Sequence, residues 1–453
     1  MTEWQRTDET GVQRSAASTV GIGFLGCGTV GAEAVRILQN RSEEILRRTG
    51  VALEVRRVAV RDLSRDRDVP LPADAFTSDP LLVVQDPRVD LVVEVIGGID
   101  PANFLLTEAL KAGKPVVTAN KELMAKFGPE LLELAESAGV DILFEAAVGG
   151  GIPIIRPVTE SLAGESARRI IAILNGTTNY ILTRMTEDGV DLAEVLADAQ
   201  RLGYAEADPT ADIDGHDAAQ KAAILASLAF GTRVHDEDVY REGIRDVRAH
   251  DVEMAARLGY VVKLVAIADL VPWADTFGVA VRVHPAMIPL THPLASVRLS
   301  FNAIFLEGES VGELMFYGRG AGAGPTAVGL VGDVIDAARN LRQQARGPHL
   351  PLPATCPIVP IEDVHSHFYV RLEVADEPGV LSGVAGVFGR HEVSIQKVLQ
   401  EGRAEDAELV LVTHRGREAD VRATLRELVS LTAVKRLAAV FRVINGEEES
   451  SFS

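Results

Sequence analysis

The stretch Val20-Gly-Ile-Gly-Phe-Leu-Gly-Cys-Gly-Thr-Val-Gly31 decides the fold of the first part of the chain. Its apolar half, Val20 to Leu25, is typical of a short buried strand. Its second half has the pattern G-x-G-x-x-G and leads into a helix, which we expect from about Val30 to Leu46. Between a strand and a helix, such glycines permit a tight turn and let the backbone approach a pyrophosphate. The stretch therefore predicts a dinucleotide-binding fold, with a purely structural glycine turn as the alternative.

The residues of this turn are the predicted cofactor contacts. Gly26, Gly28 and Gly31 shape the loop. Thr29 and Val30 begin the helix, where free backbone N–H groups bind phosphate.

The charged segment after the second expected strand, Val55 to Val60, bears on which dinucleotide binds. It reads Arg61-Asp-Leu-Ser-Arg-Asp-Arg67. An acidic residue at this place binds the ribose hydroxyls of NAD, whereas an arginine binds the 2′-phosphate of NADP. Arg61 comes first, and Asp62 is available to pair with an arginine. We therefore predict NADP, with Arg61 as a contact, and keep NAD as the alternative.

Strands and helices alternate up to about Gly149. Further strands are expected at Leu91–Ile96, Pro115–Thr118 and Ile142–Phe144, which predicts a doubly wound parallel sheet of the Rossmann type. Ligands bind beyond the carboxyl ends of such strands. Because Lys121 follows one of these ends, we predict that it faces the cofactor or the substrate, the alternative being a surface lysine.

An apolar helix, His216 to Phe230, follows an acidic loop in the middle of the chain. Its ordinary charged residues are Asp217 and Lys221, which share one face because they are four residues apart. Burying a charge costs several kcal/mol unless partners are supplied. The pair is therefore a candidate site rather than a surface ion pair. We expect Asp214 to cap the helix.

Two glycine-rich turns supply further polar groups. Leu174-Asn-Gly-Thr-Thr-Asn-Tyr-Ile181 places Gly176 and Thr177 where they can contact a polar substrate, although such residues also form turns and caps. Glu145-Ala-Ala-Val-Gly-Gly-Gly-Ile-Pro153 offers carbonyls and one carboxylate, which are hard ligands for a light cation, or it is a hinge. Strands of a second sheet are expected at Phe277–Val283, Ser296–Phe301 and Asn302–Leu306.

The last part of the chain predicts a separate unit. A helix from about Thr326 to Arg342 is expected to pack back on the first domain, and residues 346–363 are proline-rich and predict a linker. Ser366 to Asn445 follows the order strand, helix, strand, strand, helix, strand, which is the ferredoxin-like βαββαβ pattern. Since this unit has no obvious catalytic cluster, we predict a regulatory role.

Composition narrows the class of protein. The chain has 453 residues with a formal net charge of −20, so it repels nucleic acid and anionic membranes, and we expect neither as a partner. Cys27 and Cys356 cannot form a disulfide framework, which fits a reducing, cytoplasmic location. No apolar run reaches the roughly 18 residues of a membrane span.

Four motifs together resemble the homoserine dehydrogenases that carry a C-terminal ACT domain, and the similarity extends from Val20 to Ile444. With no aspartate kinase segment before it, the chain resembles the monofunctional form. The motifs are Gly-Cys-Gly-Thr-Val-Gly, Thr-Ala-Asn-Lys-Glu-Leu, Asn-Gly-Thr-Thr-Asn-Tyr-Ile-Leu and Gly-Tyr-Ala-Glu-Ala-Asp-Pro-Thr-Ala-Asp-Ile-Asp-Gly-His-Asp-Ala-Ala-Gln-Lys.

The resemblance implies NAD(P)-dependent interconversion of L-homoserine and L-aspartate 4-semialdehyde, in threonine, methionine and isoleucine synthesis. By motif, Lys221 would transfer the proton and Asp217 would orient it. Lys121 matches a second active-site lysine, and whether Lys221, Lys121 or a water between them donates the proton stays open. Tyr204, Glu206 and Asp212 match the substrate end, where Glu206 would bind the amino group of the substrate.

The resemblance also implies a sodium ion, feedback control and assembly. The sodium ligands, mostly backbone oxygens, would come from Glu145, Val148, Gly150 and Ile152. Asp376-Glu-Pro-Gly-Val-Leu381 matches the usual ACT turn, which implies threonine as effector, with a role in dimerisation alone as the alternative. ACT domains commonly pair, which implies a homodimer or homotetramer.

Two other functions compete with homoserine dehydrogenase activity. One is another amino-acid dehydrogenase of similar fold, such as one acting on diaminopimelate; the other is a non-catalytic amino-acid sensor.

The expected domains are a flexible tail at 1–18, a dinucleotide-binding domain at 19–149 completed by 319–345, a substrate-binding and dimerisation domain at 150–318, the linker at 346–363 and an ACT regulatory domain at 364–446.

Overall fold

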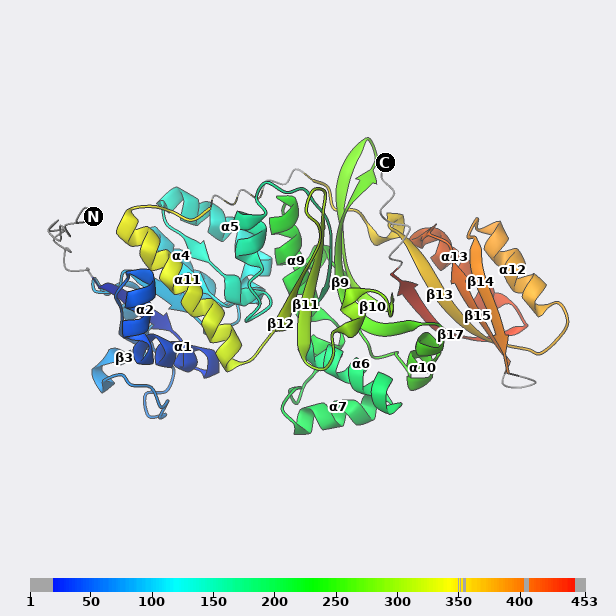
Figure 1. Cartoon of the computed structure of the whole chain (residues 1–453), viewed down its shortest axis with the longest axis horizontal. Coiled ribbons are helices and arrows are strands. Elements are labelled where there is room, and N and C mark those ends of the chain that lie inside the picture. The colour runs from blue at the N-terminus through cyan, green and yellow to red at the C-terminus, as the bar shows by residue number, and fades with distance from the viewer. Residues whose placement is uncertain (1–18, 349, 351, 353–355, 403–406, 445–453) are drawn as a thin grey trace, which may run out of the picture.

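The computed structural model describes residues 19–348, 350, 352, 356–402 and 407–444. The tail expected at 1–18 lies outside the described residues. Figure 1 shows an elongated molecule in which the N-terminal region, a central sheet with its helices and the C-terminal region follow one another along the long axis. Among the described helices, none is long and apolar enough to cross a membrane.

The N-terminal region is a six-stranded parallel sheet in the order β3-β2-β1-β4-β5-β6, which confirms the predicted doubly wound fold. This order places the carboxyl ends of β1, β4 and β5 side by side, at the edge where such sheets bind ligands. Its strands are β1 (Val20–Leu25), β2 (Leu53–Ala59), β3 (Phe76–Thr77), β4 (Leu91–Glu94), β5 (Val116–Thr118) and β6 (Ile142–Leu143). Its helices are α1 (Thr29–Asn40), α2 (Ser42–Thr49), α3 (Leu81–Val84), α4 (Ala102–Lys111) and α5 (Lys121–Ala138).

The single helix expected from about Val30 to Leu46 is wrong, because the chain breaks at Arg41 into α1 and α2. Arg41 has φ −114° and ψ 17°, outside the helical range. The second helix has acidic residues in its first turn and basic residues in its last, which suits the dipole of a helix that starts anew.

Helix α11 (Ala323–Gln343) returns to the N-terminal region and packs on α1. Its buried side chains, among them Leu330 and Val334, share one apolar cluster with Ile22 and Phe24 of β1 and Val35 of α1. The long helix lies across the N-terminal region in Figure 1. The last part of the central segment is thereby anchored on the first domain.

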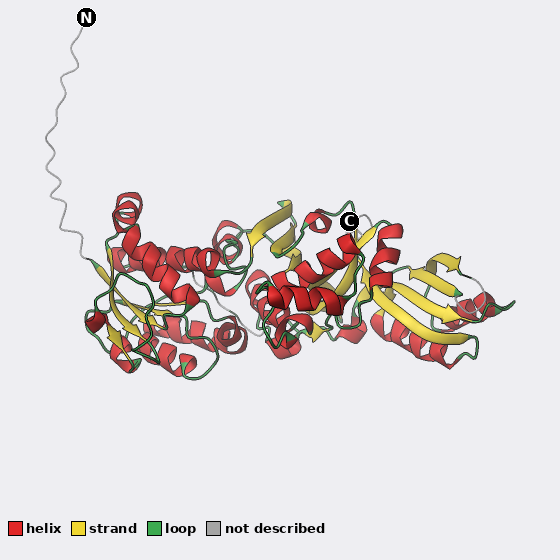
Figure 2. Cartoon of the chain, turned by 90° about the horizontal axis from the view of Figure 1, so that it is seen from below, coloured by secondary structure: helices red, strands yellow, loops and turns green. Residues whose placement is uncertain are grey.

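The central region is a mixed sheet with helices on one face, seen from below in Figure 2. Helices α6, α9 and α10 pack on β9, and α9 also packs on β10. The strands here are β7 (Ala167–Ile173), β8 (Tyr240–Arg241), β9 (Tyr260–Trp273), β10 (Thr276–Pro289), β11 (Phe301–Gly308) and β12 (Gly312–Arg319). The helices are α6 (Gly176–Asp188), α7 (Leu192–Arg201), α8 (Thr210–Ile213), α9 (His216–Phe230) and α10 (Ala249–Arg257).

The strand expected at Ser296–Phe301 is wrong. A short 3₁₀ turn occupies Pro293–Ser296, and Leu299 has a positive φ of 54°. Leu294 and Val297 are fully buried in an apolar cluster with residues of β7, β9, β10 and β11. These apolar residues therefore pack a loop against the sheet instead of forming a strand.

The C-terminal unit has the predicted ferredoxin-like βαββαβ order. Its strand β17 also pairs in parallel with β10, at Ala286–Arg442 and Met287–Val443, so that one eleven-stranded sheet includes both regions. Its elements are β13 (His365–Val374), α12 (Val380–Arg390), β14 (Ile395–Glu401), β15 (Glu408–Thr413), β16 (Gly416–Arg417), α13 (Glu418–Ser430) and β17 (Val434–Val443).

Candidate active site

Helix α9 buries the charged pair that its sequence predicts. Asp217 and Lys221 are each 8% exposed, and Lys221 Nζ lies 2.7 Å from Asp217 Oδ2. Lys221 Nζ also donates to the backbone oxygen of Leu174 at 2.8 Å. The remaining residues of the helix are mostly small or apolar and are buried, so the pair has no polar face to belong to.

A second lysine reaches the same carboxylate from the N-terminal region. Lys121 is the first residue of α5, directly after β5, and its Nζ lies 3.1 Å from Asp217 Oδ1. Asn120 caps this helix by accepting from Leu123 N and donates to the oxygen of Gly98 at 2.6 Å. The structure thus brings Lys121 to the pair in α9, and Asp217 bridges two lysines from different regions.

Asn175 is a central residue that the sequence alone did not single out. Its Nδ2 donates to Asp212 Oδ1 at 2.7 Å and to Asp217 Oδ2 at 2.9 Å. Its Oδ1 accepts from Thr178 N at 2.8 Å, which caps α6. An asparagine before a helix start signals a cap, but no local pattern shows that the amide also joins two carboxylates.

The charges in this cluster shift one another. Burial acts to raise the pKa of Asp217, but Lys221 and Lys121 outweigh it, so the pKa lies well below its usual range. Burial acts to lower the pKa of Lys121, yet Asp217 and Asp212 outweigh it, and the pKa is raised. Burial raises the pKa of the Asp212 carboxyl. Asp217 is therefore ionised and Lys121 is held in its charged form.

The other predicted substrate residues lie around this cluster at different depths. Thr177 Oγ1 donates to the oxygen of Tyr204 at 2.8 Å, and Tyr204 stacks on Tyr180 with ring centroids 4.7 Å apart. At Gly176, an added Cβ would lie 2.8 Å from the oxygen of Ser300, so the close approach requires glycine. Gly176, Thr177 and Tyr180 belong to α6, and Tyr204 lies in the segment between α7 and α8.

Two acidic residues of the loop lie apart from the lysines. Glu206 is exposed, its backbone oxygen accepts from Gln200 Nε2 at 3.0 Å, and it is not among the described residues that contact Asp217 or Lys221. Asp214 does not cap α9 as expected. The cap is Gly215, at φ 79°, because the carboxylate of Asp214 instead accepts from Arg245.

The glycine turn after β1 fits a dinucleotide. At Gly26, with φ 102°, an added Cβ would lie 2.8 Å from the oxygen of Val95, and at Gly31 it would lie 2.9 Å from the oxygen of Gly26. At Gly28 it would meet open space. Gly28 is the N-cap of α1 and forms no side-chain cap, so the first turn at Thr29 and Val30 offers its N–H groups to a phosphate.

The charged turn after β2 leaves Arg61 exposed. The prediction of NADP assumed that Asp62 pairs with an arginine, but among the described residues its carboxylate forms no ion pair with an arginine side chain. Its carboxylate accepts from Ser64 N at 2.9 Å and from Ser64 Oγ at 2.6 Å, because a short turn brings the serine closer. Arg67 donates to the backbone oxygens of Asp62 and Arg65. Hydrogen bonds among its own residues therefore hold this turn, and Arg61 is exposed.

The buried carboxylate of Glu94 holds the loops between the glycine turn after β1 and the lysine–aspartate cluster. Glu94, fully buried at the end of β4, accepts from Ile96 N at 2.7 Å and from Gly97 N at 3.0 Å. It also accepts from Thr118 Oγ1 at 2.6 Å, and the same hydroxyl accepts from Asn120 N at 3.0 Å. Glu94 thus connects the loop after β4 with the residues that lead to Lys121.

The segment predicted to bind a cation is buried, and its carboxylate is already engaged. Glu145 accepts from the backbone N–H groups of Ile154, Ile155 and Arg156. Within the described ranges, no backbone N–H donates to the oxygens of Val148, Gly150 or Ile152. The fit to a light cation therefore rests on these carbonyl oxygens, not on the Glu145 carboxylate. The described residues contain no cluster of three or more His, Cys, Asp or Glu side chains suited to a metal.

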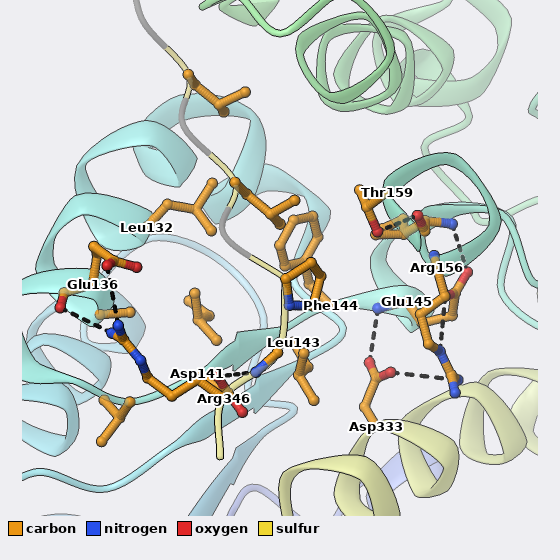
Figure 3. A pocket seen from close by; sticks show the side chains of 18 of the residues that line it. Leu132, Glu136, Asp141, Leu143, Phe144, Glu145, Arg156, Thr159, Asp333 and Arg346 are labelled. Carbon is orange, nitrogen blue, oxygen red and sulfur yellow. Dashed lines mark hydrogen bonds and ion pairs between the residues drawn. The ribbon is translucent and has the colours of Figure 1, made fainter. Parts of the chain in front are cut away.

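A cavity of about 550 Å³ borders this segment. Figure 3 shows Asp333 of α11 reaching up to Glu145 and Arg156. Asp333 Oδ2 accepts from Glu145 N at 2.8 Å, and Arg156 Nη1 lies 2.5 Å from Asp336 Oδ2. These contacts tie α11 to the loop that leaves the N-terminal sheet.

The sequence matches three family models. Residues 26–145 match the NAD-binding domain of homoserine dehydrogenase, residues 153–335 match homoserine dehydrogenase, and residues 368–433 match the ACT domain. A homoserine dehydrogenase of Synechocystis sp. is 49% identical, over 94% of this chain and 100% of its own length. That of Corynebacterium glutamicum is 46% identical, over 95% of this chain and 97% of its own length.

Solved structures agree. A homoserine dehydrogenase from Thiobacillus denitrificans superposes with a TM-score of 0.89 and 40% identity, covering 95% of this chain and 99% of its own. A hyperthermophilic archaeal homoserine dehydrogenase in complex with NADPH has a TM-score of 0.60 and 31% identity, covering 71% of this chain and 98% of its own. With a nicotinamide-binding domain, a buried lysine–aspartate cluster and an ACT domain in one sequence, the chain belongs to the homoserine dehydrogenase family.

Proposed function

We propose that this chain interconverts L-homoserine and L-aspartate 4-semialdehyde with a nicotinamide dinucleotide, and that Lys221 is the proton-transfer group. The observation that carries the assignment of Lys221 is its two hydrogen bonds, to Leu174 O and to Asp217 Oδ2. In a neutral amine, two N–H bonds used in this way leave the lone pair for a substrate proton. In the ammonium form, the same arrangement leaves one N–H for the substrate oxygen.

The nicotinamide, when bound, exchanges a hydride with the carbon that carries the substrate oxygen. Side chains of the protein stabilise the charge on that oxygen and transfer its proton. Lys221 receives or supplies the proton, while Lys121, kept charged by Asp217, stabilises negative charge on the oxygen. Asp217 holds both lysines in place. Asp212 and Glu206 are proposed to bind the substrate amino group, with Gly176, Thr177 and Tyr204 shaping the pocket.

The preference for NADP over NAD is part of this proposal. The exposed guanidinium of Arg61 is available to a 2′-phosphate, while the carboxylate of Asp62 is occupied by Ser64. A sodium ion is proposed at the buried carbonyl oxygens of Val148, Gly150 and Ile152, with the backbone oxygen of Glu145 as a further ligand.

We also propose threonine feedback through the C-terminal unit and assembly into a homodimer or homotetramer. The outer strand of the shared sheet is β14, and Val398 and Leu399 on this strand are 44% and 36% exposed. An open edge with apolar side chains supports pairing between copies. The free cysteines Cys27 and Cys356 support a reducing compartment such as the cytoplasm.

The test is the initial rate of NADP⁺ and NAD⁺ reduction with L-homoserine by the intact protein, by Lys221→Ala and by Lys126→Ala. Lys221→Ala is expected to lose about 100-fold or more of the rate, the usual scale for a proton-transfer group. Lys126 is exposed on the same helix as Lys121 and serves as the control. Matching circular dichroism spectra would exclude misfolding as the cause.

Three results would contradict the proposal. Full activity of Lys221→Ala would move proton transfer to Lys121 or to a water. Turnover of a diaminopimelate substrate in place of homoserine would assign another dehydrogenase. Threonine binding without turnover by the folded, intact chain would assign an amino-acid sensor.

A further inference from the structure

Glu94 is a fully buried carboxylate at the edge of the parallel sheet where such folds bind their ligands. It ends β4, and Thr118, which ends β5, is its direct partner in the parallel pair of strands. Because partners in such a pair point to the same face of the sheet, the side chains meet, and Thr118 Oγ1 donates to Glu94 Oε2 at 2.6 Å. Thr118 is fully buried too, so water does not compete for this hydrogen bond.

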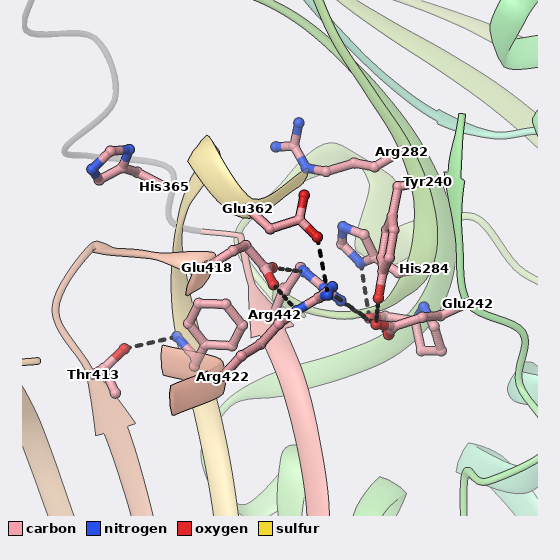
Figure 4. A network of polar contacts seen from close by, with 12 residues as sticks. Tyr240, Glu242, Arg282, His284, Glu362, His365, Thr413, Glu418, Arg422 and Arg442 are labelled. Carbon is pink, nitrogen blue, oxygen red and sulfur yellow. Dashed lines mark hydrogen bonds and ion pairs between the residues drawn. The ribbon is translucent and has the colours of Figure 1, made fainter. Parts of the chain in front are cut away.

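The donors that hold Glu94 differ from those that hold a buried carboxylate of the ACT domain. Glu418, which is 1% exposed, pairs with the guanidinium groups of Arg442 and Arg422, as Figure 4 shows. Glu94 instead accepts from two backbone N–H groups and one hydroxyl, which are uncharged donors. These donors lie in the loop after β4 and at the end of β5. Glu94 therefore joins two chain segments at the ligand-binding edge instead of neutralising a nearby charge.

The first of these segments, the loop after β4, packs against the glycine turn after β1. Ile96 N and Gly97 N both donate to Glu94 Oε1, at 2.7 and 3.0 Å. An added Cβ on Gly26 would lie 3.2 Å from Ile96 N, so the turn and the loop are in contact. Gly97 and Gly98 have φ of 78° and 71°, and an added Cβ on either would meet open space. Glu94 therefore fixes a loop whose backbone is open to a ligand beside the glycine turn.

The second segment, at the end of β5, leads to Lys121. Thr118 Oγ1 accepts from Asn120 N at 3.0 Å, which leaves the hydrogen of the hydroxyl for Glu94. Asn120 donates from Nδ2 to the oxygen of Gly98 at 2.6 Å, and it caps α5, whose first residue is Lys121. A chain of hydrogen bonds therefore connects the loop beside the glycine turn, through Glu94 and Thr118, with the helix start that carries Lys121.

We propose that Glu94 and Thr118 are a positioning pair for the reaction, which fixes Lys121 relative to the loop beside the bound coenzyme. Hydride transfer and stabilisation of charge then take place at the same carbonyl group of the substrate. Lys121 meets Asp217 across the boundary between two domains, so its position depends on where α5 begins. A misplacement of about 1 Å near reacting groups can cost about 100-fold in rate. The inference rests on the proposed function, because the pair acts through Lys121.

The experiment compares initial rates of homoserine oxidation by the intact protein, Thr118→Val and Thr118→Ser. Valine keeps the shape of threonine without the hydroxyl, whereas serine keeps the hydroxyl. Thr118→Val is expected to lower kcat by roughly 10-fold to 100-fold, because Lys121 is then misplaced. KM for the coenzyme should change little, since the glycine turn that is proposed to bind the pyrophosphate is unaltered. Thr118→Ser is expected to retain most of the activity.

Thr77→Val is the matched control. Thr77 is a buried threonine that ends β3 of the same sheet, and its hydroxyl accepts from Asp79 N, two residues on, at 3.1 Å. The substitution therefore removes the same kind of local hydrogen bond without touching the chain that leads to Lys121. It is expected to leave kcat unchanged.

A double substitution separates positioning from a loss of stability. In Asp217→Asn the contact that holds Lys121 is already weakened, so adding Thr118→Val should lower kcat little further. A purely structural role would lower kcat by the same factor with and without Asp217→Asn. If Thr118→Val lowers the melting temperature more than Thr77→Val does, Glu94→Gln carries the same test. It keeps the shape of the side chain and presents an amide N–H to the hydroxyl of Thr118.

Unchanged kcat in folded Thr118→Val or Glu94→Gln would overturn the inference. So would an equal loss in Thr118→Val and Thr77→Val, or an equal factor with and without Asp217→Asn. If the intact chain does not oxidise homoserine, the proposed function fails and this inference fails with it. The other outcomes overturn the inference alone, so the two failures are distinct.

Discussion

Lys121 Nζ lies 3.1 Å from Asp217 Oδ1, so one ion pair joins the first turn after β5 in the nucleotide domain to helix α9 of the substrate domain. The contact spans the boundary between the two domains at the edge where the parallel sheet binds ligands. Because Asp217 also holds Lys221, the geometry of both lysines depends on one carboxylate.

Asp217→Asn is expected to lower kcat by about 100-fold or more, because it removes the charge that positions both lysines while keeping the shape of the side chain. It should also move the alkaline limb of the pH–rate profile to lower pH, since Asp217 raises the pKa of Lys121. Asp198→Asn, whose carboxylate pairs with Arg201 on the surface, is the control. An alkaline limb that stays in place would contradict the link between Asp217 and Lys121.

Asn175→Ala is expected to lower both stability and activity. The helix α6 loses its cap, which costs about 1 kcal/mol of unfolding free energy. Asp212 and Asp217 also lose the donor that lies between them. Urea unfolding measures the first effect and kcat/KM for homoserine the second. Asn40→Ala, at the exposed end of α1, serves as the control; equal behaviour of the two variants would remove Asn175 from the site.

Asp333 is expected to make stability depend on pH. Burial, together with the charge of Glu145, raises its pKa to about 8. An aspartate in the unfolded chain ionises near pH ~3.9. Between these values the folded state holds a proton that the unfolded state lacks. The stabilising contribution is therefore complete at low pH and is lost as pH rises through the folded pKa.

Melting curves of the intact protein and of Asp333→Asn, which stays neutral, test this effect. Relative to the intact protein, the variant should gain stability as pH rises from about 4 to about 8 and gain no more above that. Parallel pH curves for the intact protein and Asp333→Asn would show that Asp333 is ionised in the folded state.

Arg61→Ala is expected to raise KM for NADP⁺ by roughly 10-fold to 100-fold, the scale of a lost charge-assisted hydrogen bond. KM for NAD⁺ should change little, because NAD lacks the 2′-phosphate. Arg65→Ala, in the same exposed turn, is the control. An equal rise of KM for both coenzymes would show that Arg61 does not bind the 2′-phosphate selectively.

Patterns within about twenty residues were enough to predict most of the secondary structure and part of the candidate site. The strand–glycine–helix pattern predicted the first sheet, since strand and helix periodicities are local properties. Asp217 and Lys221 could be paired from their spacing, because residues four apart on a helix are neighbours. The predicted secondary structure was wrong where tertiary packing overrode the local pattern, as at Ser296–Phe301, whose apolar residues pack a loop against the sheet.

The sequence by itself determined the fold class, the family and the residue types of the candidate site, because glycine turns, helix spacing and long motifs each involve residues that are close together in sequence. Only the tertiary structure decided that Lys121 meets Asp217, that Asn175 joins Asp212 to Asp217, and that β10 pairs with β17. Each of these contacts joins residues far apart in sequence. Their proximity results from the packing of whole elements, which no short stretch records.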